Sequence, residues 1–281
     1  MISEFAPAKV NLALHVTAKR GDGFHLVDSL VVFADIGDHL SIETAPRDHL
    51  EVTGLFAAGV PVGPENLVWK AANLFPDRPP LKITLEKNLP PASGIGGGTS
   101  DGAAIVRGLV RLLGHEVPKA SELTSLGADL PVCVTARPSR MAGIGEVVEP
   151  ITNLPPFNSL LINPGVEVST ARVFGMLSRT DGKGLSPFPL ADDRGEWLAY
   201  LHDQRNDMAM AAQSMVPKIS EALQALAGAK HCQLARMSGS GATVFGLFPD
   251  ANSAAAAGRT IADHHKDWWI APTMLVGSGD P

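Results

Sequence analysis

The segment PPASGIGGGTSDGAA, residues 90–104, has the composition of a loop that binds an anion. It places four glycines within five positions, directly before a stretch with helical spacing, at Gly94, Gly96, Gly97 and Gly98. Glycine lets a backbone adopt positive φ and approach a ligand closely, and a helix N-terminus adds unpaired N–H groups, so phosphate is the expected occupant. The alternative is a structural turn, although glycine costs about 0.5–1 kcal/mol relative to alanine at each position.

This loop differs from three common nucleotide-binding patterns. No Gly-Lys pair follows it, as a P-loop requires, and the HRD and DFG motifs of protein kinases are absent. A dinucleotide-binding loop needs an acidic residue about 20 positions further on, where this chain has Ser121.

Composition restricts the class of protein further. The 281 residues, of which 45% are hydrophobic, suffice for one large domain or two smaller ones, and a formal charge of -6 argues against binding to nucleic acid. Cys133 and Cys232 lie in apolar runs and are expected to be reduced, buried thiols of a cytoplasmic protein. The sequence shows neither a secretory signal nor an apolar run of roughly 18 residues, so we expect no membrane partner.

Hydrophobic spacing predicts a strand-rich beginning and helices after the glycines. The predicted strands are 10–17, 29–36, 39–44, 81–87, 130–135, 159–162, 234–237, 243–248 and 269–276. The predicted helices are 65–75, 100–113 (ended by Gly114), 121–126 (with Ser121 as N-cap), 170–178, 196–227 (interrupted near Pro217) and 253–264. Residues 180–195 should form an exposed loop and 277–281 a frayed end. The proline-rich segment 149–157 indicates a connection between lobes, so the predicted class is α+β with two lobes.

Three motifs, in order along nearly the whole chain, resemble those of the GHMP small-molecule kinases. They are APAKVNLALHV at 6–16, LPPASGIGGGTSDGAA at 89–104 and RMSGSGATVFGLF at 236–248. The resemblance implies an N-terminal lobe at residues 1–150, related to a ribosomal-protein domain, that binds ATP and carries the catalytic residues. It also implies a C-terminal ferredoxin-like lobe at residues 151–281 that contributes to the substrate pocket.

Four segments, AKVNL, KRGDGFHLVDSL, LGADLPV and QRNDM, resemble members of this family that act on a cytidyl substrate. The resemblance implies transfer of the γ-phosphate of ATP to the 2-hydroxyl of a cytidine-diphosphate-linked methylerythritol, in the non-mevalonate route to isoprenoid precursors. Two alternatives stay open: a GHMP kinase of the homoserine or mevalonate type, and a non-catalytic nucleotide-binding regulator. The sequence leaves the oligomeric state open, a homodimer included.

The resemblance makes Asp129 the base that accepts the substrate's hydroxyl proton, with Lys9 as its partner and as a stabiliser of charge on the transferred group. From the sequence alone, an aspartate after glycine more commonly caps its own turn, and a lysine at a strand end more commonly extends into water. Asn11 shares a strand face with Lys9, and is either a substrate ligand or a satisfied edge amide.

The resemblance assigns the glycine loop to ATP. The expected ATP-binding residues are Pro90, Pro91, Ala92, Ser93, Gly94, Ile95, Gly96, Gly97, Gly98, Thr99 and Ser100. Mg²⁺ is expected on ATP oxygens and water, near Ser100, without a dedicated site. Asp101 should point away from the phosphates, because its charge would repel them if it were aimed inward.

For the acceptor, the resemblance makes His25 a reader of the cytosine edge, with Phe24 and Phe174 stacking on the two faces of the base. Phe174 is alternatively a core residue, and Thr170 either caps its helix, contacts the substrate or does both. The remaining expected substrate-binding residues form a glycine turn, for which a tight hairpin is the alternative: Ser238, Gly239, Ser240 and Gly241.

Overall fold

The structure, a computed structural model, describes residues 1–278, so the predicted frayed end at 277–281 lies mostly outside the described residues. Its contacts group the chain into two compact units, each built from separate segments. The first comprises Met1–Lys9, Ile36–Pro91 and Gly96–Ala136, and the second comprises Val10–Asp35, Ala92–Ile95 and the chain from Arg137 onward. The two long N-terminal strands contribute residues to both units. The division of the lobes at residues 150 and 151 stays a prediction.

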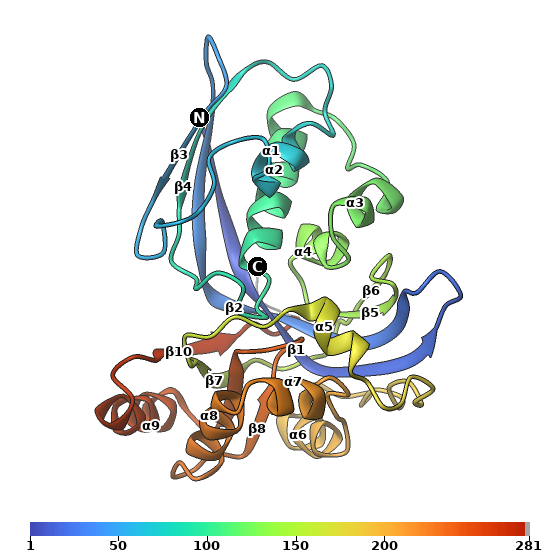
Figure 1. Cartoon of the computed structure of the whole chain (residues 1–281), viewed down its shortest axis with the longest axis vertical. Coiled ribbons are helices and arrows are strands. Elements are labelled where there is room, and N and C mark those ends of the chain that lie inside the picture. The colour runs from blue at the N-terminus through green and yellow to red at the C-terminus, as the bar shows by residue number, and fades with distance from the viewer. Residues whose placement is uncertain (279–281) are drawn as a thin grey trace. The chain divides into compact units, whose positions relative to one another are not determined.

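The first unit combines strands with four helices. Its strands are the first part of β1 (Ile2–Lys19), the second part of β2 (His25–Thr44), β3 (His49–Thr53) and β4 (Leu81–Glu86). Strand β4 pairs antiparallel with β2 and parallel with β3. The helices, cyan to green in Figure 1, are α1 (Leu67–Ala72), α2 (Gly97–Leu113), α3 (Ala120–Leu126) and α4 (Leu130–Thr135).

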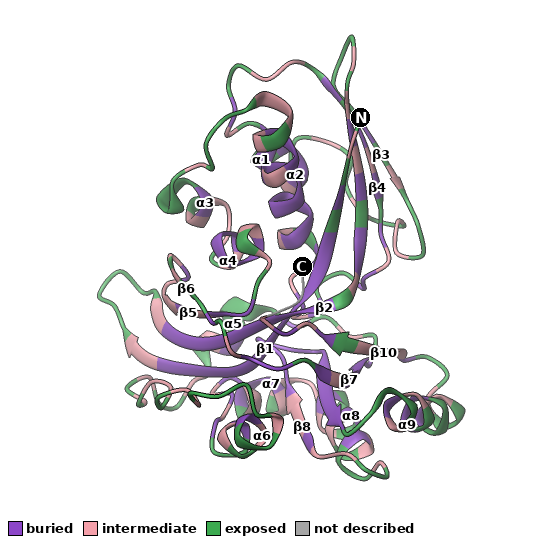
Figure 2. Cartoon of the chain, turned by 180° about the vertical axis from the view of Figure 1, so that it is seen from behind, coloured by how far each residue is buried: buried purple, intermediate pink, exposed green. Residues whose placement is uncertain are grey.

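Helix α2 is central to the first unit and confirms the helix predicted after the glycines. It starts after Gly96 and ends at Gly114. The φ angles of these two glycines, 67° and 69°, lie in the left-handed region that glycine adopts without strain. The helix contacts α1 and α4 and is buried for most of its length (Figure 2). Gly108 permits a close approach to β2, because a Cβ atom there would collide with the Ile42 side chain.

Residues 130–135 form helix α4, so the prediction of a strand there was wrong. The run LPVCVT is apolar, and a buried run of this length cannot be assigned to strand or helix by its period. Pro131 lies in the first turn, where its missing N–H group is tolerated, and Asp129 is the N-cap residue. Contacts with α2 and α3 bury Leu130 and Val132. Asp129 therefore lies at the start of a helix rather than at a turn into a strand.

Other differences from the prediction concern strands and one helix cap. The strands predicted at 29–36 and 39–44 are one continuous strand, β2. Gly37 lies within it, at a position where a side chain would collide with the Ala6 backbone. Strand β3 was not predicted, nor were β5 (Ser139–Gly143) and β6 (Val147–Pro150). The N-cap of α3 is Lys119 rather than Ser121.

The second unit contains the β-α-β-β-α-β order of a ferredoxin-like fold. Its antiparallel sheet has the order β10-β7-β9-β8, formed by β7 (Phe157–Asn163), β8 (Leu234–Met237), β9 (Val244–Phe248) and β10 (Trp269–Leu275). Helices α8 (Lys218–Ala227) and α9 (Ala251–His264) contact this sheet (Figure 1). The predicted α+β class is confirmed.

The remaining elements of the second unit surround β1 and the first part of β2. Strand β5 pairs antiparallel with both β2 and β6. The other helices are α5 (Thr170–Gly175), α6 (Arg194–His202) and α7 (Ala209–Met215), so the helix predicted at 196–227 is three helices, α6 to α8. Within residues 1–278, no helix has both the length and the apolar character needed to cross a membrane.

Candidate active site

Lys9 and Asp129 form an ion pair in the first unit, although 120 positions separate them in the sequence. Lys9 Nζ donates to Asp129 Oδ2 at 2.9 Å. The lysine side chain is only 3% exposed, whereas the carboxylate is 32% exposed. Asp129 makes no capping hydrogen bond to its own helix, so its carboxylate is oriented by the lysine rather than by the turn. A partly exposed carboxylate held by a buried cation can accept a proton from a ligand while its position stays fixed.

The glycine loop reaches this pair at the start of α2. A Cβ atom on Gly96 would lie 3.4 Å from Lys9 Cβ, so the loop backbone passes directly beside the lysine side chain. The next glycines begin the helix; Gly98 is exposed, and a Cβ atom there would meet no atom of residues 1–278 within 4 Å outside its own helix turn. The first unit therefore brings a helix N-terminus, a cation and a carboxylate together, which is suited to binding and orienting a phosphate.

Ser100 differs from the other residues of the loop, because its polar groups are engaged inside the first unit. Its hydroxyl donates to the Pro7 carbonyl at 2.7 Å and its amide donates to the Gly96 carbonyl at 2.7 Å. The side chain is buried next to Cys133, and burial raises the pKa of that thiol to about 12, so Cys133 is an uncharged core residue. Residues 1–278 contain no group of three or more His, Cys, Asp or Glu side chains able to hold a metal ion.

In the second unit, Asn11 connects β1 to two neighbouring segments. Its Nδ2 atom donates to Ser29 Oγ at 2.7 Å, and its backbone amide donates to Ser238 Oγ at 3.1 Å. Ser238 Oγ in turn donates to the Gly94 carbonyl at 3.2 Å. The sequence interpretation missed Ser29, whose hydroxyl also donates to the Ala13 carbonyl at 2.6 Å. A lone serine in an apolar strand was the only available signal.

The turn 238–241 packs directly against the other part of the glycine loop, residues 92–95. At Gly94, where φ is 76°, a side chain would collide with the Gly241 carbonyl and lie 2.9 Å from the Ser238 carbonyl. Asn206 holds the same turn by donating to the Met237 and Gly239 carbonyls at 2.8 and 2.9 Å. Two glycine-rich segments thus meet in the second unit with no room for side chains between them.

Residues of α5 also reach this part of the second unit. The helix is capped by Ser169, whose side chain accepts from the Arg172 amide, so Thr170 is not the cap. Instead, the Thr170 hydroxyl hydrogen-bonds with Ser240 Oγ at 2.7 Å. The structure therefore connects two residues that were assigned to the acceptor independently.

The aromatic residues assigned to the acceptor lie at the β1–β2 turn and on α5. The His25 and Phe174 rings stack with centroids 4.7 Å apart and an angle of 14° between planes. Phe174 is half-buried and its neighbour Val173 is the buried residue of α5, which argues against a core role for Phe174. Phe24 is 59% exposed. Burial and the charge of Lys19 lower the pKa of His25, which favours the neutral ring.

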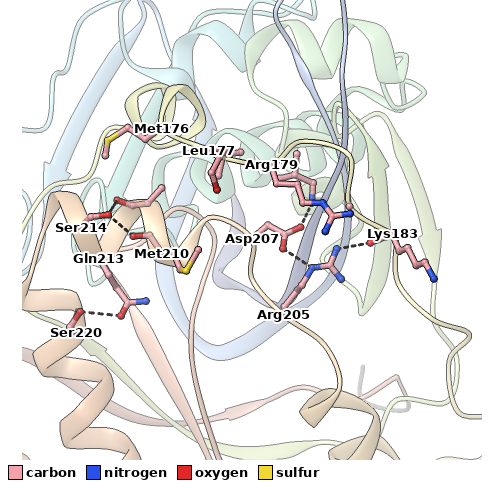
Figure 3. A pocket seen from close by; sticks show the side chains of 14 residues that line it. Met176, Leu177, Arg179, Lys183, Arg205, Asp207, Met210, Gln213, Ser214 and Ser220 are labelled. Carbon is pink, nitrogen blue, oxygen red and sulfur yellow. Dashed lines mark hydrogen bonds and ion pairs between the residues drawn. The ribbon is translucent and has the colours of Figure 1, made fainter.

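Figure 3 shows a separate pocket of about 1110 Å³ in the second unit, lined in part by α7 and by residues that follow α5. None of the predicted site residues lines it. Its Arg205 donates to Asp207 at 2.6 Å and to the Lys183 carbonyl at 2.7 Å, so this cation is engaged within the pocket wall (Figure 3). The pocket has its own ion pair, Arg205 with Asp207, but no residue of the glycine loop 90–100 lines it.

Comparison with known proteins agrees with these features. Residues 66–147 match the GHMP kinases N terminal domain, and residues 190–267 match the GHMP kinases C terminal domain. A relative from Dinoroseobacter shibae, named 4-diphosphocytidyl-2-C-methyl-D-erythritol kinase, is 49% identical over 98% of this chain and 95% of its own length. A relative of the same name from Paracoccus denitrificans is 48% identical, over 97% of this chain and 96% of its own length.

Solved structures show the same relationship. A crystal structure of 4-(cytidine 5'-diphospho)-2C-methyl-D-erythritol kinase matches with a TM-score of 0.79 and 29% identity, over 98% of this chain and 100% of the other. Homoserine kinase from Cytophaga hutchinsonii matches with a TM-score of 0.66 and 17% identity, over 98% of this chain and 96% of the other, which shows a shared fold. Both family domains and near full-length relatives match this chain. The chain, with its two glycine segments and its Lys9–Asp129 pair, therefore belongs to the GHMP kinase family.

Proposed function

We propose that this chain transfers the γ-phosphate of ATP to the 2-hydroxyl of 4-(cytidine 5'-diphospho)-2-C-methyl-D-erythritol, which gives the 2-phosphate and ADP. The reaction belongs to the non-mevalonate synthesis of isoprenoid precursors in the cytoplasm. The ion pair of Lys9 with Asp129 beside the start of α2 carries the proposal of phosphoryl transfer. The choice of acceptor is supported by the names of relatives that are 46–49% identical over nearly the whole chain.

Asp129 is the base in this proposal. Phosphoryl transfer requires an oriented nucleophile and compensation of phosphate charge more than it requires a strong base. The Asp129 carboxylate is exposed enough to reach an alcohol, and Lys9 fixes its position at 2.9 Å. The proton of the 2-hydroxyl passes to Asp129 as the oxygen attacks the γ-phosphorus and the bond to the β-phosphate oxygen breaks. The Lys9 ammonium stabilises the negative charge that develops on the transferred group.

The nucleotide binds along the glycine loop, residues 90–100, in this proposal. The amides at the start of α2 donate to phosphate oxygens, and exposed Gly98 lets the phosphates approach the backbone. Mg²⁺ would be held by the phosphate oxygens and water, and it would supply compensation of the phosphate charge. Because the Ser100 hydroxyl donates to Pro7, the side chain is oriented into the unit and serves to fix the first turn of the helix.

The acceptor is proposed to bind residues of the second unit. The rings of Phe174, Phe24 and His25 supply stacking and edge contacts for cytosine, and Phe174 and Phe24 are both accessible enough to do so. Asn11 and the turn Ser238–Gly241 are proposed to hold the methylerythritol part. The hydrogen bond between Thr170 and Ser240 fixes this turn to α5.

A panel of acceptors tests the proposal. The purified chain is incubated with ATP, Mg²⁺ and, in turn, the cytidyl acceptor, homoserine or mevalonate, and ADP release is measured. We expect kcat/KM for the cytidyl acceptor to exceed that for the other two by about 10³-fold or more, because homoserine and mevalonate carry no base that could use the aromatic contacts. Preference for homoserine or mevalonate would establish the other enzyme type, and nucleotide binding without any product would establish a regulator.

A further inference from the structure

Three charged side chains lie buried in the first unit at the base of the glycine loop. Lys87 follows β4, Asp38 lies in β2 and Asp101 lies in α2, just after its first turn. Lys87 Nζ donates to Asp101 Oδ2 at 2.7 Å and also forms an ion pair with Asp38 Oδ2. All three side chains are at most 5% exposed. Sequence analysis gave no indication of this cluster, because its members do not follow any local period.

The cluster joins the two ends of the loop. Asp38 Oδ1 accepts from the backbone amides of Asn88 and Leu89 at 2.5 and 2.9 Å, which fixes the segment that leads into the loop. Asp101 belongs to the helix that leads out of it, and its carboxylate turns into the first unit, where Lys87 holds it. A Cβ atom on Gly97 would lie 3.5 Å from Lys87 Nζ and 3.8 Å from Asp38 Oδ2. Of these two charged groups, the Lys87 ammonium is the nearer to the Cβ position of Gly97.

Stability alone does not explain such a cluster. Removing ions from water is costly, and buried ion pairs are often replaced by apolar residues without loss of stability. Asp101 Oδ1 is buried and accepts no hydrogen bond from any residue in 1–278, so one carboxylate oxygen has lost its hydration without compensation. Burial raises the pKa of Asp101 to about 7. Burial alone would lower the pKa of Lys87, but the two carboxylates outweigh it and raise that pKa, which keeps the lysine charged.

We propose that Lys87 is a positioning residue for the nucleotide, which fixes the start of α2 from beneath and compensates the charge of the two carboxylates buried behind the phosphate-binding amides. Asp38 orients Lys87 and the segment before the loop, and Asp101 anchors the helix to it. This inference rests on the proposed binding of ATP by the loop. In this proposal the Lys87 ammonium lies on the side of the loop backbone that faces the protein interior. It acts on the nucleotide through Gly97 rather than by direct contact.

Two substitutions of the cluster should have different effects on nucleotide affinity. Lys87→Met leaves two buried carboxylates behind the loop, so we expect Kd for a non-hydrolysable ATP analogue with Mg²⁺ to rise about tenfold or more. Asp101→Asn keeps the shape and the lysine but removes one negative charge, so Kd should stay equal or fall. With Lys87→Met, KM for ATP should rise, while kcat and KM for the acceptor change by less than about threefold.

Arg107→Met is the matched control. Arg107 lies further along the same helix, α2, and forms an ion pair with Glu4. It should lower thermal stability without changing Kd for the analogue. Titration calorimetry and melting temperatures separate the outcomes. A purely structural cluster would weaken nucleotide binding in both variants as stability falls, and a weaker Kd in Asp101→Asn would overturn the inference even if Lys87→Met failed to fold. Absence of analogue binding by the unaltered chain would instead refute the proposed function.

Discussion

The buried ammonium of Lys9 lies 2.9 Å from the Asp129 carboxylate, at the point where the glycine loop enters α2. Asp129 is the more exposed partner, and the lysine is the more buried one. This arrangement leaves the carboxylate accessible and keeps the cation fixed behind it. The pair therefore has the properties needed to orient an alcohol for attack on a phosphate held by the loop.

Asp129→Asn should abolish most turnover while the nucleotide still binds. The amide retains an oxygen that accepts from Lys9, so the fold and the loop remain, but it cannot accept the acceptor's proton. We expect kcat to fall by about 10²–10⁴-fold. Steady-state kinetics and titration with an ATP analogue measure the two effects separately. Turnover equal to that of the unaltered chain would remove Asp129 from the mechanism.

Two alanine substitutions in the glycine loop should separate folding from phosphate binding. Gly94→Ala forces a side chain against the Gly241 and Ser238 carbonyls at a φ of 76°, so it should destabilise the fold by about 1–3 kcal/mol or more. The methyl group of Gly98→Ala meets no atom of residues 1–278 within 4 Å outside its own helix turn, so the variant should fold at least as well, but the methyl group should obstruct the phosphates and raise Kd for nucleotide. Melting temperatures and calorimetry test both variants. Unchanged nucleotide affinity in Gly98→Ala would place the phosphates elsewhere.

Phe174→Leu should weaken acceptor binding selectively. Stacking of a base on an aromatic ring is worth about 1–3 kcal/mol, so KM for the cytidyl acceptor should rise by roughly 5- to 150-fold. KM for ATP should not change. The control is Phe188→Leu, which removes a ring that packs against Trp197 and should lower stability without affecting KM. Equal KM values for Phe174→Leu and the unaltered chain would exclude Phe174 from the acceptor site.

Stability should fall below about pH 6.5 because of His15. Burial, followed by the charge of Arg205, lowers the pKa of His15 in the folded chain. His15 Nε2 accepts from the Arg205 amide at 3.3 Å, so Nδ1 carries the proton and donates to the Lys183 carbonyl at 3.1 Å. The unfolded chain binds the additional proton more readily, so this stability is fully present above the unfolded pKa and is lost as the pH falls from there through the lower pKa of the folded chain.

Urea unfolding at several pH values between 7.5 and 5 measures this effect. His15→Gln removes the titrating group and should flatten the dependence, whereas the exposed His264→Gln should not. Parallel curves for the unaltered chain and His15→Gln would show that His15 does not titrate differently on folding.

The sequence predicted elements with a long or regular hydrophobic period. Helix α2 and strand β4 were predicted close to their observed bounds because their apolar residues recur at regular spacing. Helix α4 was mistaken for a strand because a short, largely apolar run of six residues fits both periods, and tertiary contacts with α2 decide between them. Two strands were predicted at 29–36 and 39–44, but β2 continues through Gly37, which permits a close approach to Ala6.

The site was predicted less evenly. The glycine loop could be predicted from its local composition, because a cluster of glycines by itself indicates a backbone with unusual conformational freedom. The pairing of Lys9 with Asp129 joins positions 120 residues apart, and only the resemblance to a family indicated it. Lys87, Asp38 and Asp101 could not be predicted, because no local pattern indicates which buried charges meet after folding. Ser29 was missed for the same reason.

The most direct test of the proposed reaction is phosphorus NMR of the product formed from ATP and the cytidyl acceptor. In a 2-C-methylerythritol the 2-hydroxyl is on a carbon that bears no hydrogen. A phosphate placed there should give a new phosphomonoester signal without splitting by a neighbouring proton, together with the signals of ADP. A split signal would mean phosphorylation of another hydroxyl, and the absence of any new phosphomonoester would contradict the proposed activity.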